Sequence, residues 1–465
     1  MKLLCISNGH GEDVIALRIL KPLRQMQPDF APDFAPHLES HLELSALPIA
    51  GTGEAYRAAD VPIVGPVQAM PSGGFLNRSL KELARDMRQG LLSLTRSQIT
   101  AIKAWAKTGD IVLAVGDIVP LLFAYLSGRP YIFVGTAKSE YWLRDERGKL
   151  PITQAFPASL CAQLEGWSGS VYLPWERWLM SRDRALALFV RDNLTAHQLQ
   201  TLGIAAQCAG NPMMDGLTST GQLTALLKPL RQLPPAPQID AIAPNGTAKA
   251  TALYVTPKQQ LNPPLTLALL PGSRAPEAYQ NWERILAAAP SLSHSFPYRP
   301  LILLAAIAPS LSLTQLQTRL SDWHPVPTAR PYLTFTQGNL TLLIITDAYS
   351  DCLHEADLAI ATAGTATEQF VGLGKLAITL PGPGPQFTES FATVQAKMLG
   401  PAVQIVYNPE EIGPTLTKIL NDPDRLQLIY QTGKQRMGAP GAGSAIARQI
   451  SQILKTLSSP IQNKT

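Results

Sequence analysis

A strand, a turn of small residues and a helix follow one another between residues 357 and 371, and this stretch most constrains the fold. Asp357–Ile360 predicts a short buried strand, and the helix that follows runs through Glu368 and Phe370. The turn between them, Ala361–Ala366, directs backbone N–H groups outward, where the helix dipole adds positive potential. It could therefore hold phosphate, although small residues also serve such turns through packing alone.

Similar strand–helix pairs recur along the chain and predict parallel sheets. The predicted strands are 2–7, 111–115, 131–134 and 187–190 in the first half, and 265–270, 301–307, 342–345 and 358–360 in the second. A length of 465 residues indicates two domains, each with its own core. We therefore expect an α/β chain of two Rossmann-like domains.

Composition shifts predict the domain boundaries. The first domain spans 1–216, and a linker or insertion spans 217–264, much of it rich in Pro, Ala, Gln and Asn. The second domain spans 265–440, and residues 441–465 form a helix that crosses back to the first domain.

The overall composition is that of a globular protein, with 46% hydrophobic and 16% charged residues. A net charge of +5 suits an anionic ligand or a membrane surface and does not indicate a nucleic-acid partner. The four cysteines are far apart, which predicts neither a zinc site nor a disulfide framework. No signal peptide or membrane-spanning run is predicted, so a cytoplasmic location is expected.

The loop after the first strand carries titratable groups at the edge of the sheet where α/β proteins bind ligands. Gly9 and Gly11 let a substrate approach the backbone, and His10, Glu12 and Asp13 lie beside them. In the structural alternative, Asp13 caps the next helix and His10 is a surface turn residue.

Asp117 follows the strongly hydrophobic strand 111–115 and precedes a helix with Pro120 in its first turn. A carboxylate in this position is well placed to act as a catalytic base, and it could equally cap the helix.

Two segments of the first domain combine basic and apolar residues. Residues 75–107 predict a helical region with a stripe of Arg78, Lys81, Arg85 and Arg88, which could dock on anionic lipid headgroups while its apolar face packs in the core. The aromatic and basic residues 172–178 suit an exposed binding rim or a packed cluster.

Three segments together resemble lipid-A-disaccharide synthase and its relatives: 271–274 (PGSR), 361–368 (ATAGTATE) and 210–215 (GNPMMD). The second half also looks like the GlcNAc transferase of peptidoglycan synthesis. The resemblance implies a GT-B fold, in which two Rossmann-like, doubly wound parallel-sheet domains face a cleft. The opening loop, Gly9–Asp13, and Asn211 depart from the family pattern, which marks this chain as a divergent member.

The resemblance implies a role for each matching residue. Arg274 and Ser273 would bind the diphosphate of a UDP-sugar with Gly364, Thr365 and Ala366, and Glu368 would bind the ribose. Gln386 and Gln395 would contact the sugar. Gly9, Gly11, Glu12 and Asp13 would bind a lipid acceptor, with Asp117 or His10 as the catalytic base.

The implied reaction is an inverting transfer of a GlcNAc-type sugar to a lipid, with no cofactor besides the UDP-sugar substrate. An arginine and a helix N-terminus can stabilise the leaving diphosphate without a metal. The one Asp-x-Asp, Asp422–Asp424, falls where a turn is expected. The alternatives are a UDP-GlcNAc epimerase and a non-catalytic protein that binds nucleotide sugars or lipids. A peripheral contact with the cytoplasmic face of the inner membrane is also expected.

Overall fold

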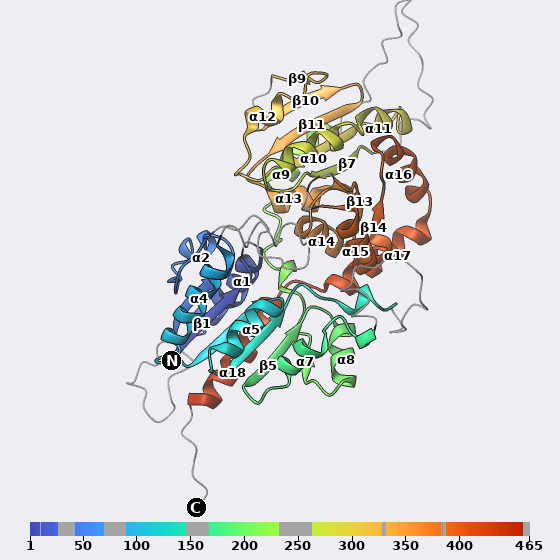
Figure 1. Cartoon of the computed structure of the whole chain (residues 1–465). Coiled ribbons are helices and arrows are strands. Elements are labelled where there is room, and N and C mark those ends of the chain that lie inside the picture. Colours follow the sequence, from blue (N-terminus) through green and yellow to red (C-terminus); the bar gives the residue numbers. More distant parts are fainter. Residues whose placement is uncertain are drawn as a thin grey trace, which may run out of the picture. The chain divides into compact units, whose positions relative to one another are not determined.

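The chain divides into two compact units, each with its own sheet (Figure 1). A computed structural model describes residues 1–9, 11–26, 42–68, 90–145, 167–231, 263–327, 332–382, 384 and 387–458. The first unit comprises Met1–Gly216 together with Met437–Thr465, and the second comprises Leu217–Arg436.

A parallel sheet of six strands, ordered β2-β1-β3-β4-β5-β6, forms the centre of the first unit. Strands β3 and β4 are buried along their whole length and almost continuously hydrophobic, as expected of parallel strands covered on both faces. The strands are β1 (Lys2–Ser7), β2 (Glu43–Pro48), β3 (Ile111–Gly116), β4 (Tyr131–Gly135), β5 (Ala185–Val190) and β6 (Ala206–Gln207).

Helices from both ends of the chain cover this sheet. They are α1 (Gly11–Gln25), α2 (Glu54–Arg57), α4 (Leu91–Trp105), α5 (Ile118–Leu126), α7 (Pro174–Met180), α8 (Asn193–Thr201) and α18 (Ala442–Ser458), with short 3-10 turns η2 (Glu140–Trp142) and η3 (Pro212–Met214). Helix α18 buries Ile446, Ile450 and Leu454 along one stripe and packs against α1, so the C-terminal helix belongs to the first unit.

The second unit contains an eight-stranded sheet in the order β14-β13-β12-β7-β8-β11-β10-β9. It is parallel from β14 to β11, and β10 and β9 add antiparallel strands at one edge. The strands are β7 (Leu265–Leu270), β8 (Leu301–Ala306), β9 (His324–Pro325), β10 (Leu333–Gln337), β11 (Leu340–Ile345), β12 (Leu358–Ala361), β13 (Leu376–Thr379) and β14 (Val403–Ile405).

Helices alternate with these strands along the chain. They are α9 (Gln222–Arg231), α10 (Glu277–Leu286), α11 (Ala289–Ser295), α12 (Leu313–Gln317), α13 (Tyr349–Glu355), α14 (Thr365–Gly372), α15 (Glu389–Leu399), α16 (Ile412–Leu420) and α17 (Pro423–Met437), with η4 (Gly400–Ala402) and η5 (Pro409–Glu411). In the described residues of both units, no helix is both long enough and apolar enough to cross a membrane.

Residues 217–264 were predicted to be a linker or insertion. The first part of this segment is instead structured, because it contains α9, which belongs to the second unit. Leu223, Leu227 and Leu230 face one side of α9 and are buried against the core of the second sheet. The carboxylate of Asp351 accepts hydrogen bonds from the Thr220 and Gly221 backbone N–H groups and so fixes the start of the helix. Residues 232–262, the rest of the predicted insertion, lie outside the described residues.

Each sheet has one point where the strand order reverses. In the first unit the chain leaves β1 for β2 on one side and then returns to add β3 on the other. In the second, β8 to β11 lie on one side of β7 and β12 to β14 on the other. These two doubly wound sheets confirm the predicted α/β fold class. Open α/β sheets bind ligands outside the carboxyl ends of the strands at such a point. The ends of β1 and β3, and those of β7 and β12, are therefore the expected ligand-binding edges.

Candidate functional site

The turns after β7 and β12 lie side by side at the reversal point of the second sheet. The Thr362 N–H donates to the Leu270 carbonyl at 2.9 Å. From α10, the Asn281 side-chain amide donates to the Pro271 carbonyl at 3.1 Å and to that of Thr362 at 3.5 Å. Asn281 therefore joins the two turns, and the predicted segments 271–274 and 361–366 form one edge.

The start of α14 is open at this edge. Gly364 is the N-cap, and no side chain caps the helix. Thr365 is exposed, and Gly364 and Ala366 are partly exposed. The first N–H groups of the helix, together with its dipole, therefore give this turn the means to bind an anion.

The loop after β7 adds a cationic residue. Gly272 has a φ of 96°, a conformation that favours glycine, and lies beside the Thr362 carbonyl. Ser273 is exposed and Arg274 is partly exposed. The arginine and the open helix start thus come from neighbouring strand ends, and an arginine binds phosphate oxygens well.

Two polar residues of α10 that the sequence analysis did not single out organise this edge. Glu277 accepts a hydrogen bond from the Phe387 N–H at 2.9 Å, and Asn281 lies against Gly382. Both side chains are buried, and they connect the loop after β13 to the two turns. Their helical spacing was the signal in the sequence: Glu277 and Asn281 are four residues apart, next to Ala278 and Trp282, and so lie on the face of α10 that is buried.

Two predicted sugar and ribose contacts are less open than expected. Gln395 is 1% exposed, and its side-chain amide donates to the Gly364 carbonyl at 2.9 Å, so it supports the turn from α15. Glu368 is 8% exposed in the first turn of α14. Both lie on the inner faces of amphipathic helices, which residue type alone does not reveal. Gln386 lies outside the described residues.

In the first unit, a reciprocal pair of hydrogen bonds joins the ends of β1 and β3. The Asn8 side-chain amide donates to Asp117 Oδ1 at 2.8 Å, and the Asp117 N–H donates to Asn8 Oδ1 at 2.9 Å. Gly116, with a φ of 135°, makes room for this contact, because a Cβ there would lie 1.8 Å from Asn8 Oδ1. Asn8 was not among the predicted site residues.

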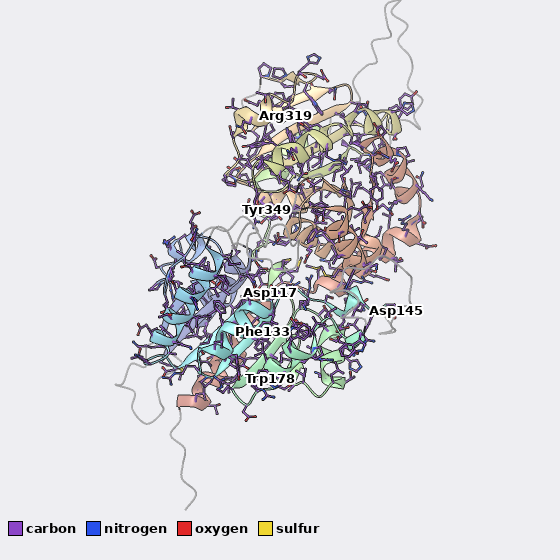
Figure 2. All side chains as sticks on the ribbon, in the orientation of Figure 1. Asp117, Phe133, Asp145, Trp178, Arg319 and Tyr349 are labelled. Atoms are coloured by element: carbon purple, nitrogen blue, oxygen red, sulfur yellow. The ribbon has the colours of Figure 1, made fainter. Side chains whose placement is uncertain are left out.

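Asp117, labelled in Figure 2, takes the capping role that was one of the two alternatives its sequence position predicted. It is the N-cap of α5, because Oδ1 accepts a hydrogen bond from the Val119 N–H at 2.9 Å. Burial raises the pKa of this carboxyl, and the bonds from Asn8 and Val119 and the nearby Lys138 charge oppose that rise. A carboxylate with a raised pKa is better suited to accept a proton near neutral pH.

The acidic residues of the loop after β1 are directed into the protein. Asp13 is 3% exposed and accepts a hydrogen bond from the Ser7 hydroxyl at 2.6 Å, and that hydroxyl also contacts the Tyr56 hydroxyl at 2.7 Å. Glu12 is 9% exposed. Both acids lie in the first turn of α1, where the helix dipole stabilises their negative charge. Because both side chains are buried, neither is exposed for contact with an acceptor.

The other residues predicted in this loop are glycines and a histidine. Gly9 has a φ of 115° and approaches the Ala50 backbone so closely that any Cβ would collide with it. Gly11 begins α1. Gly9 and Gly11, which are described, can therefore offer only backbone atoms to a ligand. His10 lies outside the described residues.

Asp422 of the Asp-x-Asp sequence caps a helix. Its Oδ1 accepts a hydrogen bond from the Arg425 N–H at 3.0 Å at the start of α17, in agreement with the predicted turn. Within the described ranges, no three or more His, Cys, Asp or Glu side chains gather in a way that could hold a metal ion.

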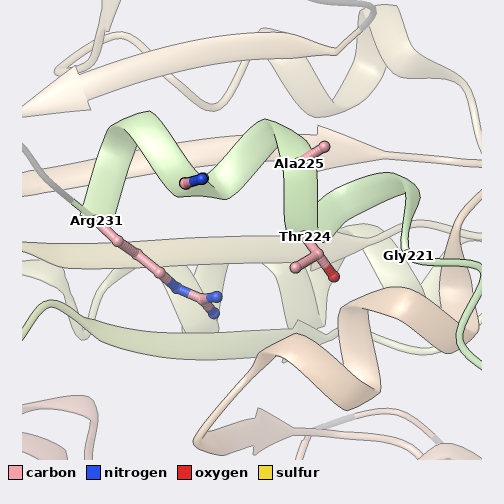
Figure 3. A pocket seen from close by; sticks show the side chains of 5 residues that line it. Gly221, Thr224, Ala225 and Arg231 are labelled. Atoms are coloured by element: carbon pink, nitrogen blue, oxygen red, sulfur yellow. The ribbon is translucent and has the colours of Figure 1, made fainter.

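A separate cavity of about 590 Å³ lies along α9 (Figure 3). Its lining consists of Gly221, Thr224, Ala225, Lys228 and Arg231. Arg231 pairs with Glu355 at 2.8 Å, and Thr224 also bonds to Glu355. The lining includes no residue of the two turns after β7 and β12, so the cavity is not part of the edge described above.

No protein-family model matches the sequence, and no curated protein sequence does. Solved structures match nearly the whole chain at low sequence identity. Among solved structures, MurG from Acinetobacter baumannii shares 15% identity, with 97% of this chain and 99% of that chain covered and a TM-score of 0.49. The UDP-GlcNAc 2-epimerase from Neisseria meningitidis, bound to UDP-GlcNAc, shares 13% identity over 98% and 99% of the two chains, with a TM-score of 0.48. The glycosyltransferase SsfS6 from Streptomyces sp. SF2575, complexed with thymidine diphosphate, shares 14% over 97% and 99%, with a TM-score of 0.44.

Proposed function

We propose that this protein is an inverting, metal-independent glycosyltransferase of the GT-B type. It moves a GlcNAc-type sugar from a UDP-sugar to a lipid acceptor, in the manner of lipid-A-disaccharide synthase and its relatives. The observation that carries the proposal is the edge of the second sheet, where segments 271–274 and 361–366 are held together at the reversal point.

The second unit binds the donor in this proposal. Arg274 and the N–H groups at the start of α14 stabilise the negative charge that develops on UDP as the bond from the anomeric carbon to the β-phosphate oxygen breaks. Asn281 and Gln395 keep the two turns in place. Preorganised donors of this kind can supply the electrostatic stabilisation that other transferases obtain from a metal ion.

The first unit supplies the acceptor site and the base. The oxygen of an acceptor hydroxyl attacks the anomeric carbon from the face opposite UDP, and Asp117 takes the hydroxyl proton. Both described hydrogen bonds to the Asp117 carboxylate end on Oδ1, so the proposal assigns Oδ2 to the acceptor. His10 is the second candidate for the base. The products are UDP and a glycolipid, and the expected location is the cytoplasmic face of a membrane.

Binding of UDP tests the donor half of the proposal. We expect Arg274→Ala to weaken UDP affinity by about 10- to 100-fold, because a hydrogen bond to a charged group contributes about 1.5–3 kcal/mol. Calorimetric titration with UDP measures this change. Arg319→Ala is the matched control, since Arg319 pairs with Glu283 on the surface of the same unit. Equal affinity in wild type and Arg274→Ala would contradict the diphosphate role.

A UDP-GlcNAc epimerase could use the same donor edge, and the products separate the two activities. Purified protein is incubated with UDP-GlcNAc alone and with UDP-GlcNAc plus an extract of membrane lipids. Release of UDP with a new glycolipid only when lipid is present supports transfer. Conversion of UDP-GlcNAc to its 2-epimer without lipid supports the epimerase, and UDP binding without either reaction supports a binding protein.

A further inference from the structure

Helices α5 and α7 of the first unit present an exposed aromatic surface. Trp167, Trp175 and Trp178 are 79%, 51% and 46% exposed, and they are the exposed tryptophans of the described part of the chain. Leu122, on the neighbouring α5, is also exposed. Figure 2 labels Trp178 on α7 at the rim of this unit. Three solvent-exposed indole rings within residues 167–178 indicate a surface that binds a partner.

Arginines hold the aromatic rings of this surface in place. The Arg182 guanidinium lies 4.3 Å from the Trp178 ring, and that of Arg184 lies 4.8 Å from the Tyr125 ring. Trp178 and Tyr125 pack edge to face at 5.3 Å and so connect α7 to α5. These contacts place Tyr125, Trp178, Arg182 and Arg184 together. Trp175 lies three residues before Trp178 on α7, and Leu122 lies three residues before Tyr125 on α5. The Arg177 guanidinium donates to the Ser168 carbonyl, next to Trp167, at 3.3 Å. We call this group the α5–α7 surface: Leu122, Tyr125, Trp167, Trp175, Arg177, Trp178, Arg182 and Arg184.

The charge of the α5–α7 surface is positive. Arg177, Arg182 and Arg184 are all partly exposed, whereas Asp183 is the exposed acid between residues 167 and 184. Glu176, the other acid in that range, is buried and pairs with Lys138. Helix α5 carries no charged residue. An apolar, indole-rich surface with arginines beside it complements the interface of a bilayer that contains anionic lipid.

We propose that the α5–α7 surface docks the protein on an anionic membrane. The tryptophan rings enter the headgroup region, and the arginines pair with lipid phosphates. This docking site differs from the basic stripe within 75–107 that the sequence indicated, most of which lies outside the described residues. Membrane docking requires neither the UDP-sugar nor catalysis. An experiment can therefore confirm or exclude it independently of the proposed transferase activity.

Vesicle sedimentation of the full-length protein tests this docking without any nucleotide sugar. Vesicles of phosphatidylcholine with phosphatidylglycerol should bind the wild type, whereas pure phosphatidylcholine should bind it weakly. We expect Trp167→Ser/Trp175→Ser to lower the partition coefficient by about tenfold or more, because both rings lose their burial in the interface. Arg177→Gln/Arg182→Gln should remove the preference for anionic lipid, as should about 1 M salt, which shortens the screening length to about 3 Å.

Matched variants decide the outcome. Tyr298→Ser/Tyr430→Ser removes two exposed aromatic residues from the second unit and should leave binding unchanged. Arg85→Gln/Arg88→Gln removes charge from the basic stripe. Unchanged binding of the tryptophan variant would overturn the proposal, and so would an equal loss in the tyrosine variant or a loss confined to the stripe variant. Circular dichroism of each variant establishes that it is folded. The result does not depend on any assay of epimerase or transferase activity.

Discussion

Asp117 caps a helix, which was one of the two interpretations of its sequence position, and the contacts of the cap bear on the other, the proposed role as base. Its Oδ1 caps α5 and accepts the Asn8 amide, and these bonds fix the carboxylate in one orientation. A capping aspartate is normally exposed, but this one is sufficiently buried for its pKa to rise. The cap therefore orients the group that we propose as the base.

The raised pKa of Asp117 gives a pH prediction. The carboxylate accepts a proton only when it is deprotonated, so kcat/KM should fall as pH decreases through its pKa, at a higher pH than an ordinary aspartate would give. Asp117→Asn should lower kcat by about 10²- to 10⁴-fold and leave UDP affinity unchanged. Asp422→Asn, which keeps a cap at α17, is the control and should keep both the rate and the acid limb of the wild type. An active Asp117→Asn enzyme would transfer the role of base to another residue.

Gly116 makes the contact between Asn8 and Asp117 possible, and its replacement should be costly. In Gly116→Ala the new methyl group would collide with Asn8 Oδ1, in a backbone conformation that already disfavours alanine. We expect a loss of about 2–4 kcal/mol in the free energy of unfolding, measured by urea denaturation. Gly128→Ala isolates the collision, because Gly128 also has a positive φ but nothing within 4 Å of its Cβ, and it should lose only about 1 kcal/mol. Equal losses in both variants would rule out the collision as the cause.

At the scale of elements, the start of α14 depends on neighbours distant in the sequence. The turn 361–366 could be recognised from its small residues, and its place at a strand end follows from the hydrophobic run before it. Its support comes from Asn281 on α10 and Gln395 on α15, whose amides bind the backbone of the turns. Hydrophobic periodicity in the sequence can predict that these segments are helices. It does not predict which of their polar residues face the protein interior.

Helix α13 ends on a partly buried cation, Lys375. The Lys375 ammonium group donates to the carbonyls of Leu353, His354 and Ala356, where the negative end of the helix dipole lies. Burial nevertheless lowers the pKa of Lys375 from 10.5 to about 8. The folded protein therefore binds this proton less tightly than the unfolded chain, and stability from this group should rise with pH between about 8 and about 10.5.

Lys375→Met tests this coupling of protonation to folding. The difference in unfolding free energy, wild type minus variant, should increase across that pH range, with a slope below about 1.4 kcal/mol per pH unit because the side chain is only partly buried. Denaturant titrations at several pH values measure it. Lys418→Met on α16 removes an exposed lysine and is the control for the loss of a surface charge. A flat difference for Lys375→Met would indicate that the lysine keeps an ordinary pKa.

At the scale of the whole molecule, the candidate site of each unit lies where its doubly wound sheet reverses its strand order. Asn8 and Asp117 join β1 to β3, and the turns after β7 and β12 meet in the second unit. Loops diverge to either side of such a point, which leaves backbone groups accessible. The distribution of proposed functional residues over two units thus follows from the topology.

The sequence by itself determined the α/β class, most strands and the position of two small-residue turns at strand ends, because hydrophobic runs and small-residue turns are local patterns. It also identified Asp117, since a carboxylate directly after a buried strand can be read from neighbouring residues. Only the tertiary structure decided that Asn8, Glu277, Asn281 and Gln395 hold these turns, that Glu12 and Asp13 face inward, and that α9 belongs to the second core. The reason is physical: strand order and helix rotation bring together residues more than a hundred positions apart, such as Asn8 and Asp117, and local periodicity contains no information on either.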